Sequence, residues 1–145
     1  MIKEANENDI NTLANLAILL WDSHSVQDLA NEFSGIIASD DARFFIKYEK
    51  DIPVGFAQCQ LRYDYVEGTN TSPVGYLEGI FVKEEYRNKN YARQLLKECE
   101  KWSKSKNYTE MASDCEIDNN DDSFNFHKSM KFQEANRIIC FTKKL

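Results

Sequence analysis

The sequence is short of positive charge, and this shortage argues against one large class of partners. Its 145 residues include 18 Lys and Arg against 24 Asp and Glu, which gives a net charge of −6. Proteins that bind nucleic acid gain much of their affinity by neutralising phosphates with a cationic surface. We therefore expect no nucleic-acid partner. An acidic surface suits a cationic ligand, although many proteins are acidic for solubility alone.

Histidine and cysteine are also scarce. There are two histidines and four cysteines, and the cysteines form no Cys-x-x-Cys pair: Cys59, Cys99, Cys115 and Cys140. Because a metal site needs several such ligands close together, we expect none. The cysteines are expected to be small core residues in a reducing cytoplasm. A catalytic thiol is the alternative.

Long apolar runs are absent. The amino terminus, "MIKEANENDI", is polar and lacks the basic and then apolar pattern of a secretory signal. The longest apolar stretch, "LANLAILLW", contains Asn15 and is too short to span a bilayer. We therefore expect a cytoplasmic protein that has no membrane partner.

Apolar periodicity predicts a single domain, residues 1–145, with strands and helices in mixed order. Strands are predicted over 1–5, 42–49, 54–66, 74–82 and 108–114, with one or two more in 132–145, and helices over 10–21, 26–38, 91–106 and 123–130. Asp9 and Ser25 are expected to cap the first two helices. This order predicts an α/β (α+β) fold in which helices cover a mixed sheet.

A basic turn, "RNKNYA", stands between a predicted strand and the helix after it. The first N–H groups of a helix lack partners within the helix and attract anions. Arg87 and Lys89 add positive charge, Asn90 tolerates a left-handed backbone, and Ala92 is small enough for a ligand to approach. The turn therefore predicts a diphosphate site. The alternative is a solvated turn that only offsets surface acidity.

This turn resembles the pyrophosphate loop of the GNAT acetyltransferase superfamily, Arg/Gln-x-x-Gly-x-Gly/Ala. Arg87 and Ala92 match its ends, whereas Asn90 stands where Gly is usual. The segments "LLWDSHS", "YDYVEGTNTSPVGYLEGIFV", "ASD", "DN" and "FHKSMKF" resemble the aminoglycoside 6'-N-acetyltransferases of that superfamily. The resemblance implies a GNAT fold, with a mixed, mostly antiparallel sheet of six to seven strands flanked by about four helices. It also implies acetyl transfer from acetyl-CoA to the 6'-amino group of aminoglycoside antibiotics, giving resistance.

The same resemblance implies which residues hold coenzyme A. The backbone of Ile80, Phe81 and Val82 is expected to pair with the pantetheine arm like an added strand, with an N–H near Ile80 facing the thioester oxygen. The expected diphosphate contacts are Arg87, Asn88, Lys89, Asn90, Tyr91 and Ala92. Asn119 is expected to make a second contact with coenzyme A, and helix capping is its alternative role.

On the substrate side, Glu78 and Asp114 match acidic positions of the family. A carboxylate within an apolar strand is costly unless it meets a cation or a donor. Asp114 is expected to hold the reactive amine and help to remove its proton, and a structural salt bridge is the alternative for each carboxylate. Trp21, His24 and Tyr65 match positions that line the sugar-binding wall. Without the resemblance, a core position for Trp21 and a surface position for His24 are the alternatives.

Two departures from the family pattern stand near the carboxyl terminus. In "FHKSMKF", His127 occupies a position that is tyrosine in many GNAT enzymes, and Lys131 occupies a glycine position. Because histidine exchanges protons near pH 7, His127 is the candidate proton donor to the departing thiolate. Asn136 stands at a substrate-side position where relatives can carry an acid, and Glu134 is the candidate to compensate for it.

Two alternative functions remain open at this point. One is a GNAT enzyme that acetylates a polyamine, another small amine or a protein N-terminus, and the other is a noncatalytic acyl-CoA-binding sensor. The polycationic aminoglycoside is the expected substrate. A homodimer is also expected, through pairing of closing strands that contain Ile138, Ile139, Cys140 and Phe141.

Overall fold

The computed structural model describes residues 1–116 and 121–145. Its elements, in chain order, are β1 (Ile2–Glu4), the 3-10 turn η1 (Glu7–Asp9), α1 (Ile10–Ala17), α2 (Val26–Ile36), β2 (Ala42–Glu49), β3 (Ile52–Arg62), β4 (Val74–Val82), η2 (Glu84–Tyr86), α3 (Tyr91–Ser105), β5 (Met111–Ser113) and α4 (Asp121–Ser129). The predicted order of strands and helices is therefore confirmed as far as α4.

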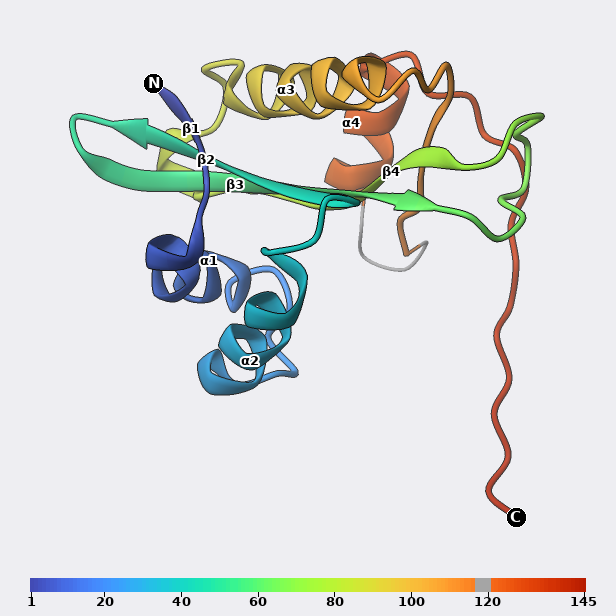
Figure 1. Ribbon diagram of the computed structural model, residues 1–145, viewed down its shortest axis with the longest axis horizontal. Helices are drawn as coiled ribbons and strands as arrows, with labels where there is room; N and C mark the ends of the chain where they lie inside the picture. Colours follow the sequence, from blue (N-terminus) through green and yellow to red (C-terminus); the bar gives the residue numbers. More distant parts are fainter. Residues whose placement is uncertain (117–120) are drawn as a thin grey trace.

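The sheet has five strands in the described part of the chain, in the order β1-β2-β3-β4-β5. The first three pairings are antiparallel, and β4 pairs with β5 in parallel. The prediction of six to seven strands is wrong because residues 132–145 form no strand. These residues extend away from the body and are almost all exposed (Figure 1). A strand needs the edge of another strand, and this segment meets none within 1–116 and 121–145.

Helices cover both faces of the sheet, with α1 and α2 on one side and α3 and α4 on the other (Figure 1). Successive residues of β2 point to opposite faces and fill two separate cores. Phe44 and Ile46 pack with α1 and α2, whereas Phe45 packs with the buried face of α3. The alternation of apolar residues along β2 therefore builds a three-layer molecule.

Two local signals at helix starts had different outcomes. Ser25 caps α2 as expected, with its hydroxyl accepting the Asp28 N–H at 3.0 Å. Asp9 makes no such contact with α1, so that prediction is wrong. Its carboxylate instead accepts the Asn6 N–H at 2.9 Å in a capping box for η1 and pairs with Lys3 at 2.7 Å.

The cysteines fall into two groups. Cys59 and Cys99 are buried core residues, as expected, and all four cysteines are free thiols. Cys115 is only partly buried and Cys140 is exposed, so the core prediction is wrong for these two. In the ranges 1–116 and 121–145, no helix is long and apolar enough to cross a membrane.

An irregularity in β4 opens the sheet. Gln58 pairs with Gly79 and Cys59 pairs with Leu77, so Glu78 is an extra residue on β4 and forms a β-bulge. The parallel pairing of β4 with β5 ends at Leu77 and Ser113. Beyond this point β4 pairs only with β3 among the described residues, so its other edge carries no strand partner there.

Candidate active site

The carboxyl-terminal half of β4 has one open edge. Ile80, Phe81 and Val82 keep their pairing with β3, while their other edge meets no strand among the described residues. The Val82 carbonyl on this stretch accepts the Nε–H of Arg87 at 2.9 Å. An open strand edge of this kind fits an extended chain of amides such as pantetheine.

The start of α3 lies at the end of the same strand. Asn90 has φ 62° and ψ 18°, a left-handed conformation, and Asn88 also has φ 62°. In the part of the chain that the structure describes, no side chain caps α3. Its first N–H groups are therefore available to an anion, and several of them can serve a diphosphate at once.

The charged side chains of this turn bond within the protein. The Lys89 ammonium lies 3.0 Å from the Glu49 carboxylate, which also accepts a hydrogen bond from the Tyr91 hydroxyl. The Tyr91 and Lys89 contacts together hold the pKa of Glu49 below its usual value. In this conformation the turn offers an anion its backbone N–H groups and the helix dipole, while Lys89 is paired with Glu49.

The two predicted carboxylates have different partners. Glu78 accepts two hydrogen bonds from the Arg62 guanidinium, at 2.9 and 2.7 Å, so the salt-bridge alternative holds for Glu78. Asp114 directly follows β5 and is exposed, and its Oδ2 accepts the Tyr76 hydroxyl at 2.5 Å. Arg62 also lies 3.4 Å from the centre of the Tyr76 ring. These four side chains form one connected group, the acidic cluster, in which Asp114 forms no ion pair with any described residue.

Trp21 packs in the core and also contacts β4. Its ring packs edge-on against Phe33 and Phe56, with centroid distances of 6.5 and 5.9 Å. The ring also lies over Gly79, where an added Cβ would come within 2.6 Å of it. The residue is half-buried, so the indole belongs to the core and also borders β4 one residue beyond Glu78.

The other predicted substrate-side residues are exposed. His24 precedes α2, with its Nδ1 3.3 Å from the Ser23 hydroxyl, and Tyr65 lies in the loop after β3. Asn136 is exposed in the carboxyl-terminal segment. Its neighbour Ala135 packs against Gly68, which lies in the same β3–β4 loop as Tyr65. The predicted contact at Asn119 lies outside the described residues.

His127 is held on α4 by both ring nitrogens. Its Nδ1 lies 2.7 Å from the Ser123 carbonyl and its Nε2 lies 2.8 Å from the Ser113 hydroxyl. Because a carbonyl only accepts, Nδ1 carries a proton. The Ser113 hydroxyl also lies 3.2 Å from the Leu77 carbonyl, at the last pairing of β4 with β5. Lys131 has φ 68°, a left-handed conformation that glycine adopts with less strain.

Sequence reasoning missed three residues of this site: Arg62, Tyr76 and Ser113. Arg62 had a signal, because Glu78 inside an apolar strand requires a cation and Arg62 is the arginine of the neighbouring strand. The other two had none. The contacts of Tyr76 and Ser113 depend on the side-by-side placement of β4 and β5, which are far apart in sequence.

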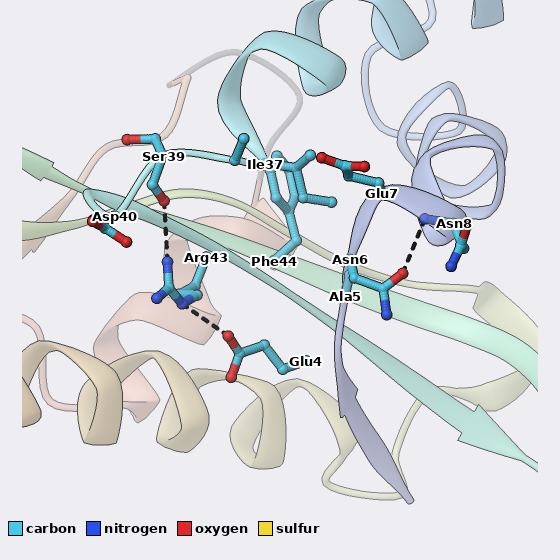
Figure 2. A pocket seen from close by; sticks show the side chains of 11 residues that line it. Glu4, Ala5, Asn6, Glu7, Asn8, Ile37, Ser39, Asp40, Arg43 and Phe44 are labelled. Carbon is cyan, nitrogen blue, oxygen red and sulfur yellow. Dashed lines mark hydrogen bonds and ion pairs between the residues drawn. The ribbon is translucent and has the colours of Figure 1, made fainter.

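A separate hollow of about 450 Å³ lies between β1, η1 and the connection from α2 to β2 (Figure 2). Arg43 crosses this hollow, with its Nε 2.8 Å from Glu4 and its Nη1 3.1 Å from the Ser39 carbonyl (Figure 2). The hollow contains none of the predicted site residues. No group of three or more His, Cys, Asp or Glu is placed to hold a metal ion within 1–116 and 121–145.

Comparison with known proteins defines the class. The model of the acetyltransferase (GNAT) family matches residues 11–132, and the chain belongs to this family. It is similar to the aminoglycoside N(6')-acetyltransferases type 1 of Serratia marcescens (35% identity, covering 100% of this chain and 99% of that protein) and of Acinetobacter haemolyticus (34%, covering 99% and 98%). The solved structure of AAC(6')-Iy with the bisubstrate analogue CoA-S-monomethyl-acetylneamine is also similar, with a TM-score of 0.93, 32% identity, and coverage of 100% of this chain and 98% of that one.

Proposed function

We propose that this protein is an aminoglycoside 6'-N-acetyltransferase, which transfers acetyl from acetyl-CoA to the 6'-amino group and so gives antibiotic resistance. The observation that carries the proposal is the combination of an open strand edge, a helix start without a side-chain cap and an exposed carboxylate around the carboxyl-terminal half of β4. The edge at Ile80–Val82 suits pantetheine, and the start of α3 suits a diphosphate. The similar enzymes named above act on aminoglycosides, and one is solved with a bisubstrate analogue.

Asp114 is the residue that receives the reactive amine. Ammonium groups of this type have pKa values of roughly 8–10, near that of lysine, so a nearby carboxylate attracts the charged form and accepts its proton, directly or through water. The neutral amine then attacks the thioester carbonyl, and an N–H near Ile80 stabilises the developing oxyanion. Glu78 is already neutralised by Arg62 and contributes to substrate binding through this pair.

His127 supplies the proton to the leaving thiolate through Ser113. Both ring nitrogens of His127 are engaged within the chain, so a proton leaving Nε2 passes first to the Ser113 hydroxyl. When His127 is charged, Nε2–H donates to Ser113, and Ser113 donates to the Leu77 carbonyl. When it is neutral, the Ser113 hydroxyl donates to Nε2 instead. For the transfer, the Ser113 hydroxyl turns from the Leu77 carbonyl to the thiolate and gives it its proton while taking the proton of Nε2, which leaves neutral His127 accepting from Ser113.

The proposal also includes a homodimer in the cytoplasm. The C-terminal arm, residues 133–145, exposes Ile138, Ile139 and Phe141 to the extent of 69%, 81% and 88%. Exposed apolar residues on an extended segment suit the edge of a sheet in a second copy of the chain. The four free thiols agree with a reducing compartment.

The test is thiol release from acetyl-CoA with kanamycin and tobramycin, beside spermidine and a short peptide as competing classes of amine. Turnover with the aminoglycosides, and acetyl located by NMR at the 6'-nitrogen, is the expected result. Turnover restricted to spermidine or the peptide would show that the substrate is another class of amine and would overturn the aminoglycoside assignment. Tight binding of acetyl-CoA with no turnover of any amine would favour the sensor.

A further inference from the structure

The hydroxyl of Tyr76 connects the core of β4 to the exposed carboxylate of Asp114. Tyr76 is only 5% exposed, and its hydroxyl donates to Asp114 Oδ2 at 2.5 Å. Asp114 itself stands at the open end of β5 and is exposed. An exposed aspartate samples several rotamers, so a short bond to a buried donor restricts it to one of them.

The Tyr76 ring is itself fixed on its other side. The Arg62 guanidinium from β3 lies 3.4 Å from the ring centre, and Arg62 is held in turn by two hydrogen bonds to Glu78 of β4. Burial, and then the hydrogen bond to Asp114, raise the pKa of Tyr76 above its usual value. The phenol therefore stays protonated and remains a donor over the working range of pH.

We propose that Tyr76 is a positioning residue for acetyl transfer, holding Oδ2 of Asp114 so that Oδ1 is left to receive the substrate amine. This inference rests on the proposed function. A fixed carboxylate places the amine at a defined distance from the thioester, and such orientation contributes to the rate of the chemical step. The charged groups around Tyr76 and Asp114 are Arg62 and Glu78. Because these two form a salt bridge with each other, Asp114 is the carboxylate that accepts the Tyr76 hydroxyl.

The test is Tyr76→Phe, which keeps the ring beneath Arg62 and removes only the hydroxyl. With tobramycin, kcat is expected to fall roughly ten- to a hundredfold, because a hydrogen bond to a charged group is lost. The KM for acetyl-CoA is expected to stay unchanged.

Two controls separate positioning from a structural effect. Tyr63→Phe removes a similar hydrogen bond, from Tyr63 to Asp41 at 3.0 Å, and is expected to behave like the wild type. In an Asp114→Asn background, Tyr76→Phe is expected to have little further effect, since it acts through Asp114. An unchanged kcat for Tyr76→Phe, or an equal loss in both backgrounds, would overturn the inference alone. A wild type inactive on every aminoglycoside would overturn the proposed function and this inference with it.

Discussion

At the scale of single residues, the carboxylates of Glu78 and Asp114 differ in the partners that surround them. Glu78 lies within β4 and receives a paired guanidinium from Arg62, which offsets the cost of a charge among apolar residues. Asp114 lies at the strand end and receives one neutral hydroxyl from Tyr76. Of the two, Asp114 is the one without a cationic partner among the described residues, which suits the role proposed for it. The sequence suggested both carboxylates as candidates, and only the positions of their neighbours separate them.

Asn90 provides a test of the diphosphate site. A β-branched residue is strained at φ 62°, so Asn90→Val is expected to lower the stability by about 1–2 kcal/mol and to weaken CoA binding, whereas Asn90→Gly is expected to preserve both. Thermal unfolding and calorimetric titration with CoA measure the two effects. Asn107→Val is the matched control, because Asn107 has φ 68° just after the other end of α3. It is expected to lose stability but to bind CoA normally, and equal CoA binding by the two Val variants would contradict the site.

At the scale of elements, the contact of Trp21 with β4 links the loop after α1 to the bulge at Glu78. A methyl group at Gly79 would lie 2.6 Å from the indole, and Phe33 and Phe56 limit the movement of that ring. We expect Gly79→Ala to cost about 1–3 kcal/mol and to change the Trp21 fluorescence, with a higher KM for the aminoglycoside.

The control for this prediction is Gly35→Ala. Gly35 lies in α2, and a Cβ there would have no atom within 4 Å. Replacing a helical glycine by alanine is expected to add roughly 0.5–1 kcal/mol of stability. If Gly79→Ala were as stable as the wild type, with unchanged kinetics, Trp21 would not border the substrate site.

Local patterns predicted the elements well where each element is decided by its own residues. The strand at 74–82 follows from a continuous apolar run, and the helix start at Tyr91 follows from the turn before it. Two predictions failed because contacts outside the segment itself decide them. Asp9 bonds to Asn6 and Lys3 and does not cap α1, and residues 132–145 meet no strand among the described residues. Pairing between distant segments is not encoded in local periodicity.

At the scale of the whole molecule, the C-terminal arm is the part that one chain leaves unsatisfied. We expect the full chain to have the mass of a dimer in light scattering, and a variant ending at Phe132 to have the mass of a monomer. The control is a variant that lacks only residues 143–145, which keeps Ile138, Ile139 and Phe141 and should remain dimeric. A monomeric full chain, or a dimeric variant ending at Phe132, would exclude the arm as the interface.

The arrangement of the whole molecule also explains which parts of the proposed site could be predicted from the sequence. The strand edge proposed for pantetheine and the turn proposed for the diphosphate lie in one continuous segment, 78–92, so a sequence pattern can reveal them together. The acidic cluster and the bond between His127 and Ser113 join β3, β4, β5 and α4. Their members come together only through folding, which is why Arg62, Tyr76 and Ser113 had to be found in the structure.

The most direct test of the central claim is the rate of thiol release from acetyl-CoA with tobramycin, measured for the wild type and for Asp114→Asn. The variant keeps the shape of the side chain and removes its charge, so a loss of kcat/KM of roughly a hundredfold or more is expected, with unchanged binding of acetyl-CoA. Spermidine should be a poor substrate for both proteins. A wild type that acetylates spermidine but not tobramycin, or an Asp114→Asn variant as active as the wild type, would contradict the account.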